Sequence, residues 1–255
     1  MTSSPIVSWL EEGPHESITN PATLVLSEVQ PQEGEVDDYL AECMVEHRTA
    51  LRVARDMSAI LGWDTVQARL TPHLVQVRHG DFGEMLATEI LVDFGGLIVP
   101  VRKVRYQIHA DQTQIGADVV GLEIVDGRVA SVHFAEVKFR STGDTAAADS
   151  AHEQLSTWHS SEFAQIVFFV GARLEESNPG LYEIFFEYLR DATVRVDQFH
   201  IILVWEAASW SDTVLSNLPQ PPDLLEPLTV RVVLIEGLVD LSDRAYQGMA
   251  ALVDL

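Results

Sequence analysis

The chain has 255 residues and a mass of 28.3 kDa, which is enough for one large α/β domain, whereas two independent domains would be a tight fit. Its 39 acidic and 16 basic residues give a net charge of −23, so the chain repels DNA phosphates unless a basic strip, a metal ion or a partner reverses the local field. No apolar run is long enough for a membrane-spanning helix and residues 1–14 lack a signal-peptide pattern, so we expect a cytoplasmic protein with no membrane partner.

Residues 1–77 form the first of three expected regions, and the first 35 of them carry no recognisable chemistry. Residues 1–35 are rich in Pro, Ser and Glu, which predicts an extended N-terminal arm with one short strand at 24–29. Apolar residues recur at helical spacing over 37–61 and predict one long amphipathic helix. The alternation over 65–77 predicts a strand.

Residues 78–171 form the expected core region, in which helices enclose a group of strands. The predicted elements are a helix at 81–92, strands at 97–108, 117–125 and 129–139, a helix at 144–159, and a strand at 165–171. Asp126 and Gly127 separate the second and third strands and are a strong hairpin signal, so we expect the first three strands to form an antiparallel meander.

Residues 172–255 continue with alternating helices and strands. The predicted elements are helices at 179–190, 211–218 and 242–253 and strands at 199–205 and 228–235. Together with the meander they predict an α/β fold in which helices flank a mixed sheet. The apolar content exceeds what a peripheral layer needs, so we expect a C-terminal α/β extension that packs on the core and offers a partner interface.

Asp118, Glu136 and Lys138 are the candidate catalytic residues. Side chains alternate along a strand, so Glu136 and Lys138 emerge on one face, and Asp118 lies on the neighbouring strand. Two carboxylates suit a hard cation such as Mg²⁺, with Mn²⁺ as a possible substitute, and such a metal polarises a phosphate and activates water. Lys138, one of only two lysines in the chain, would orient the attacking water or stabilise the developing negative charge.

The turn at 126–127 decides whether Asp118 shares a face with the other two candidates. A two-residue loop that pairs Val125 with Arg128 would turn Asp118 away from them. A three-residue loop, with its glycine in the left-handed conformation and a bulge, would pair Ile124 with Arg128 and bring Asp118 onto the same face. We expect the three-residue loop.

Several weaker candidates surround this motif. Glu84, in the helix at 81–92, could reach the metal directly or through water, although an acid early in a helix is also stabilised by the helix dipole alone. A local basic strip that could hold the DNA backbone, or could simply be a solvated strand face, consists of Arg102, Lys103, Arg105 and Arg140. His152 and Gln154, on the helix after the motif, could contact the attacking water or the phosphate.

The order of these pieces, a helix with an acid, a strand, Asp, a hairpin with Glu-X-Lys, then a helix and a strand, resembles the PD-(D/E)XK nuclease core. The resemblance covers roughly residues 78–170. More specifically, this stretch resembles HamA, the nuclease subunit of the Hachiman anti-phage defence system. The segments that carry it are 78–86, 100–106, 116–118 and 135–139. The resemblance implies a restriction-endonuclease-like core, Mg²⁺-dependent cleavage of DNA in antiviral defence, and a helicase subunit as the partner that grips the DNA.

Two other functions remain open. A stand-alone restriction-type endonuclease should carry its own basic DNA cleft, which the net charge of −23 disfavours. A non-catalytic acidic protein that mimics DNA or scaffolds a partner would not need to bring Asp118 and Glu136 together. A separation of more than about 8 Å, too far for shared coordination of Mg²⁺, would favour that function.

Overall fold

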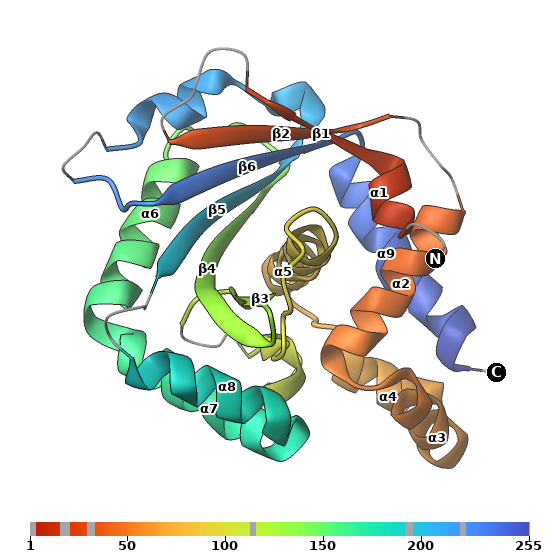
Figure 1. The fold of residues 1–255 in the computed structure, drawn as a ribbon. Helices are drawn as coiled ribbons and strands as arrows, with labels where there is room; N and C mark the ends of the chain where they lie inside the picture. The colour runs from red at the N-terminus through yellow and green to blue at the C-terminus, as the bar shows by residue number, and fades with distance from the viewer. Residues whose placement is uncertain are drawn as a thin grey trace.

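A curled, mixed sheet organises the chain (Figure 1). The structure is a computed structural model that describes residues 4–15, 21–29, 34–112, 116–191, 196–219 and 223–254. In these ranges the sheet has six strands in the order β1-β2-β6-β5-β4-β3. The strands are β1 (Leu10–Pro14), β2 (Ala22–Glu28), β3 (Val119–Val125), β4 (Arg128–Arg140), β5 (Asp197–Glu206) and β6 (Leu228–Ile235).

The centre of the sheet is parallel and its two edges are antiparallel. Strands β2, β6, β5 and β4 run in the same direction, while β1 and β3 run opposite to their neighbours. Seven consecutive residues of β5, from Phe199 to Trp205, are buried, as expected for a parallel strand covered on both faces.

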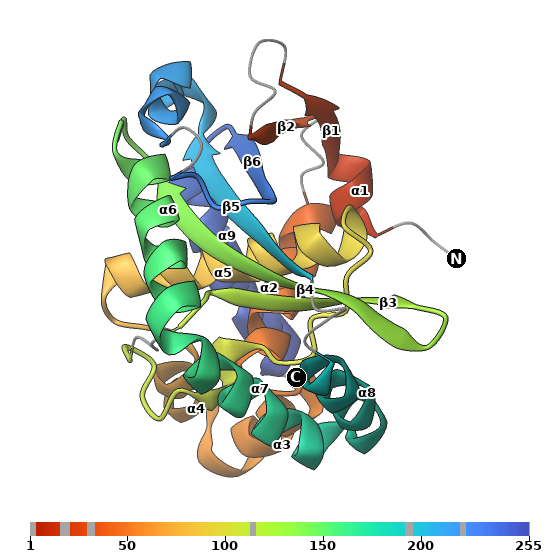
Figure 2. The same cartoon turned by 60° about the vertical axis from the view of Figure 1, so that its left-hand side comes forward.

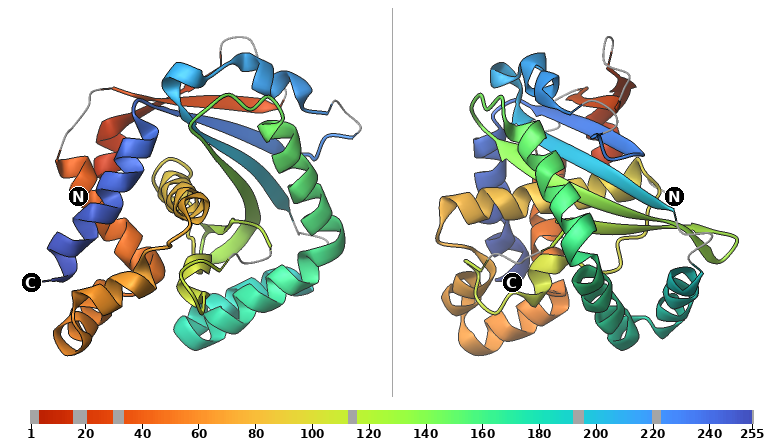
Figure 3. Two further views of the ribbon diagram at one scale, coloured as in Figure 1. Left: turned by 180° about the vertical axis from the view of Figure 1, so that it is seen from behind. Right: turned by 90° about the vertical axis from the view of Figure 1, so that its left-hand side faces the viewer.

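Helices cover both faces of the sheet and give two separate apolar cores (Figures 1 and 2). One face packs against α1 (Pro5–Trp9), α2 (Glu35–Arg48), α3 (Leu51–Leu61), α4 (Trp63–Leu70), α5 (Val75–Asp93) and α9 (Leu238–Val253). The other face packs against α6 (Ala147–Thr157), α7 (Phe163–Ser177), α8 (Pro179–Arg190) and the 3₁₀ turn η4 (Asp212–Asn217). Figure 3 shows that α5 runs across the concave side of the sheet.

The predicted α/β class with a mixed, helix-flanked sheet is confirmed, and so are most elements from β3 onward. The predicted hairpin, the helix at 179–190 and the strands at 199–205 and 228–235 correspond to β3, β4, α8, β5 and β6. Strands β5 and β6 lie at the centre of the sheet, so the C-terminal region contributes to the same sheet as the hairpin. A partner interface on that region stays a prediction.

Four predicted elements are wrong. The helix expected at 37–61 is two helices, α2 and α3, and the strand expected at 65–77 is helical in α4 and the start of α5. Residues 97–108 form a single bridge from Ile98 to Leu122 and the 3₁₀ turn η1 (Lys103–Tyr106), so the expected meander is only a hairpin. The strand expected at 165–171 lies within helix α7.

None of the helices in the described ranges has the length and apolar character needed to cross a membrane.

Candidate active site

The β3–β4 hairpin closes with a two-residue turn. Asp126 (φ 51°) and Gly127 (φ 75°) both have positive φ values, as a type I′ turn requires, and Val125 pairs with Arg128. The predicted three-residue loop, with Ile124 paired to Arg128, is therefore wrong.

A bulge one step further along the hairpin places Asp118 on the same face of the sheet as Glu136 and Lys138. Ile124 pairs with Val129 but Glu123 pairs with Ser131, so Ala130 is an extra residue on β4. The shifted register then continues to Val119 opposite Ala135. One step beyond it Asp118 lies opposite Glu136, on the predicted face, although the bulge and not the loop produces this result.

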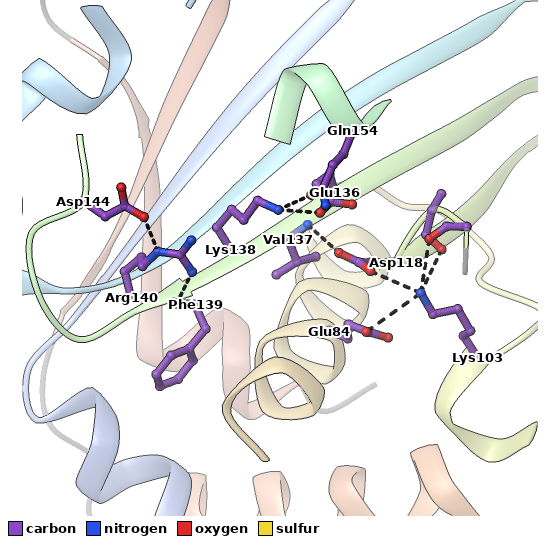
Figure 4. Close-up of polar contacts among 12 residues, drawn as sticks. Glu84, Lys103, Asp118, Glu136, Val137, Lys138, Phe139, Arg140, Asp144 and Gln154 are labelled. Carbon is purple, nitrogen blue, oxygen red and sulfur yellow. Dashed lines mark hydrogen bonds and ion pairs between the residues drawn. The ribbon is translucent and has the colours of Figure 1, made fainter. Parts of the chain in front are cut away.

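Asp118 directly precedes β3 and lies beside the part of the β4 edge that β3 does not cover. Its backbone N–H donates to Ala135 O at 3.0 Å, and its Oδ2 accepts the N–H of Val137 at 2.9 Å (Figure 4). The carboxylate thus replaces the strand that would otherwise satisfy this N–H. Because the edge is uncovered, residues from both faces of the sheet can meet at Asp118.

Glu136 and Lys138 come from the face of β4 that packs on α6. Lys138 Nζ donates to Glu136 Oε1 at 2.7 Å and also contacts Gln154 Oε1 of α6 (Figure 4). Glu136 Oε2 is buried and has no hydrogen-bond partner among the described residues. The predicted Glu136 and Lys138 pair is therefore formed, Gln154 joins it, and one carboxylate oxygen is left available.

Glu84 reaches the same edge from the opposite face. Helix α5 approaches β4 closely at Gly83, where a Cβ would lie 3.4 Å from both Val137 and Phe139. The next residue, Glu84, then lies with its Oε1 4.0 Å from Lys103 Nζ, near Asp118 (Figure 4). The structure therefore brings Glu84 beside Asp118, as predicted.

The carboxylates raise the energy of one another's ionised forms. Burial, together with the Asp118 charge, raises the pKa of Glu136 to about 9, although Lys138 opposes the shift. Burial also raises the pKa of Glu84 to about 8, with Asp118 adding to the shift and Lys103 opposing it. A site in which ionised carboxylates are costly without a further cation suits a bound metal ion.

Lys103 has a position that its sequence context did not predict. Its ammonium donates to Gly116 O at 3.3 Å, Ala117 O at 3.5 Å and Asp118 Oδ1 at 3.2 Å. Its side chain is only 9% exposed. Burial alone would lower its pKa, but the charges of Glu84 and Asp118 outweigh burial and raise it. The sequence pointed to Lys103 as one of two lysines and as a member of the basic strip, but not as a partner of Asp118.

The predicted basic strip is not a row of free cations. Lys103 is buried in the carboxylate site, and each of the three arginines is paired with an acid. The pairs are Arg102 with Glu89 at 3.3 Å, Arg105 with Glu46 at 3.6 Å and Arg140 with Asp144 at 2.6 Å. His152 has a structural hydrogen bond. Its Nε2 accepts the N–H of Leu225 at 3.0 Å and so links α6 to the segment before β6. Contacts of these residues with DNA stay predictions.

The donor set partly fits a divalent metal. Asp118 and Glu136 are neighbouring carboxylates whose charges interact, and Glu136 Oε2 has a free lone-pair position. Such oxygens suit Mg²⁺. Across the described ranges, however, no three His, Cys, Asp or Glu side chains are arranged to hold a metal ion together. Lys103 lies between Glu84 and Asp118, so the adjacent pair is the part of the site that fits a metal as it stands.

A family model identifies the chain. The model of the HamA family matches residues 6–218. The chain belongs to the HamA family. The match extends from α1 to η4 and includes all the site residues described above, so the HamA resemblance read from residues 78–170 is confirmed over a longer stretch. HamA membership fits a role in Hachiman anti-phage defence. A comparison with curated proteins gives no match.

Proposed function

We propose that the chain is a metal-dependent nuclease of the PD-(D/E)XK type that hydrolyses DNA phosphodiester bonds in Hachiman defence, together with a helicase subunit. The observation that supports the proposal is the meeting of Asp118, Glu136 and Lys138 at the uncovered edge of β4. Glu84 joins them from α5. Hydrolysis of a phosphodiester needs such a set, with carboxylates for a metal and a cation for developing charge.

Asp118 and Glu136 are the residues that would hold Mg²⁺ or Mn²⁺, and Glu84 would support them from α5. The metal would polarise the phosphate and lower the pKa of bound water. Within the chain, the N–H of Val137 fixes Asp118 Oδ2, and Lys103 fixes Asp118 Oδ1. Both oxygens are therefore oriented before substrate arrives, which lowers the cost of assembling the site.

Lys138 supplies the positive charge of the proposed reaction. Glu136 Oε1 and Gln154 Oε1 hold its ammonium next to the carboxylates (Figure 4). From there it would orient the attacking water or stabilise the negative charge that develops on the phosphate. Gln154 acts through Lys138 and is a positioning residue.

The electrostatics support a partner that delivers DNA. The net charge is −23, and the cations nearest the motif are paired with Glu89, Glu46 and Asp144. Phosphate contacts give most of the affinity of a DNA-binding protein, so this chain needs another source of such contacts. A helicase subunit that grips DNA would provide it, and the same charge disfavours a stand-alone restriction-type enzyme.

A non-catalytic acidic protein is the second candidate. The paired arginines and the missing three-ligand cluster in the described ranges favour it. Against it stands the contact between Asp118 and Glu136, which a DNA mimic or scaffold does not require.

Plasmid degradation tests the proposal. The purified chain, alone and with any helicase that is encoded beside it, is incubated with plasmid in Mg²⁺ or EDTA. We expect cleavage in Mg²⁺, none in EDTA, and a loss of at least about a hundredfold in Lys138→Ala. Glu153→Gln is the matched control, because Glu153 is an exposed acid next to Gln154 on α6 and should retain full activity. Absence of cleavage with and without the helicase would favour the non-catalytic protein.

A further inference from the structure

A cavity adjoins the carboxylate site on its α7 side. Its volume is about 180 Å³, and it shares Lys103 and Asp118 with the site. The opposite wall belongs to the start of α7, where Ile166 packs against Gly116 and a Cβ on that glycine would lie 3.4 Å from Ile166 Cγ1. A substrate held at Asp118 would therefore have this cavity directly beside it.

The size and walls of the cavity suit one flat ring. Its apolar lining includes Val101, Val120, Phe169 and Val170. An apolar cavity of roughly 150 Å³ in another protein binds benzene, so a cavity of this volume accommodates a six-membered heterocycle.

The polar groups of the cavity favour a ligand that donates a hydrogen bond. Glu162 and Gln165 both line it, and Glu162 Oε2 is a buried oxygen without a partner among the described residues. Glu162 is the last residue of the π-helical turn η2 (Trp158–Glu162) that joins α6 to α7. Such turns are rare and occur frequently at functional sites. A buried acceptor without a partner is costly unless a ligand donates to it.

We infer that this cavity binds an unpaired cytosine base of the DNA strand at the site, an inference that rests on the proposed nuclease function. Cytosine is a single six-membered ring whose N4 amino group is a donor that Glu side chains accept. Thymine has a carbonyl oxygen at the same place, which would face the oxygen of Glu162. The cavity therefore distinguishes the two pyrimidines and requires the base to leave its duplex stack.

An aromatic surface continues from the cavity, and Arg173, which is paired with Glu176 at 3.2 Å, lies against it. Phe169 lines the cavity and meets Tyr106 edge to face with ring centroids 5.7 Å apart. The Arg173 guanidinium lies 4.5 Å from the centroid of the Tyr106 ring. Aromatic rings and arginine are the groups on which single-stranded nucleic acids stack. This surface offers the neighbouring nucleotide a platform, which supports a single-stranded substrate.

Binding without cleavage tests the inference. The probes are a short oligothymidine and the same oligomer with one central cytidine, measured in EDTA at low salt by fluorescence anisotropy. We expect the cytidine oligomer to bind about tenfold more tightly, the gain of one charge-assisted hydrogen bond. Pairing the probe with its complementary strand should remove this preference.

Substitutions of Glu162 and Ile166 sharpen the test. Glu162→Gln presents both an acceptor and a donor, so it should bind the two oligomers equally, while Glu175→Gln, an exposed change on α7, should keep the preference. Ile166→Phe should fill the cavity and weaken binding of the cytidine oligomer. Equal binding of both oligomers by the unmodified chain, or a preference that survives in Glu162→Gln, would overturn the inference.

The outcome is separable from that of the plasmid experiment. A cytidine preference in a chain that cuts no plasmid would reject the nuclease and retain the base-binding cavity. Plasmid cleavage without a cytidine preference would reject the cavity alone.

Discussion

Removal of Lys103 should destabilise the protein more than any exposed charge does. Lys103 is 9% exposed and its ammonium makes three hydrogen bonds, one of them to Asp118, with Glu84 4.0 Å away. Removing one partner of a buried ion pair costs about 3–5 kcal/mol, because the remaining charge loses its counter-ion. We therefore expect Lys103→Met to lower the free energy of unfolding by about 3–5 kcal/mol, which corresponds to roughly 10 °C in Tm for a chain of this size.

Urea denaturation of paired variants measures this cost. The control is Arg52→Met, since Arg52 is 81% exposed in its pair with Asp56 and should change stability by less than about 0.5 kcal/mol. Adding Asp118→Asn to Lys103→Met should recover about 1–3 kcal/mol, because Asp118, 3.2 Å from the ammonium, is the carboxylate that loses its counter-ion. If Lys103→Met were as stable as Arg52→Met, the ammonium would not be the counter-ion of the site.

Two further predictions concern the sheet. Burial, with the charges of Arg231 and His133, holds the pKa of His200 well below its usual 6.5. The unfolded chain therefore binds more protons, so stability is complete above about pH 6.5 and falls below it, by up to about 1.4 kcal/mol per pH unit for this residue. Thermal scans between about pH 7.5 and pH 5 should show a smaller loss in His200→Gln, and an unchanged slope would contradict the assignment. In the hairpin turn, Gly127→Ala should cost about 1 kcal/mol in urea denaturation because φ is 75°. Gly143→Ala, at an open loop position without positive φ, should cost nothing, and equal effects of the two would refute the turn geometry.

The sequence predicted the residues of the site better than the hairpin geometry that brings them together. Alternation along β4 was enough to place Glu136 and Lys138 on one face, because the strand period is two. The face of Asp118 depended on one extra residue, and the bulge at Ala130 supplies it within β4. No residue type marks such a bulge, so its position could not be read from the sequence.

Short apolar runs account for the wrong strand assignment at 165–171. A run of this length is compatible with a buried strand or with a helix. Ile166, Val170 and Leu174 are buried side chains of α7, and their spacing of four continues beyond the predicted strand. A longer window would have favoured the helix. The same spacing links Val66 and Leu70, the buried residues of α4.

Particular side chains account for two other differences. At 97–108, Ile98 pairs with Leu122, but Pro100 has no N–H to extend the ladder, and Lys103 then turns toward the carboxylate site. Between α2 and α3 the Glu46 side chain accepts the N–H of Leu51 at 2.7 Å, which stabilises a new helix start where the apolar pattern runs on without a break. Neither contact follows from local propensity.

The uncovered edge of β4 also bears on how the protein avoids self-association. A strand edge with free N–H and C=O groups is a template on which another chain can add as a further strand. At this edge the Asp118 carboxylate already accepts the N–H of Val137, and Lys103 encloses the adjoining backbone carbonyls. Asp118 and Lys103, which belong to the proposed active site, therefore also block the addition of a further strand at this edge. Asp118→Asn retains an acceptor for that N–H. Asp118→Ala would instead remove the proposed metal ligand and also leave the N–H of Val137 free to pair with another chain.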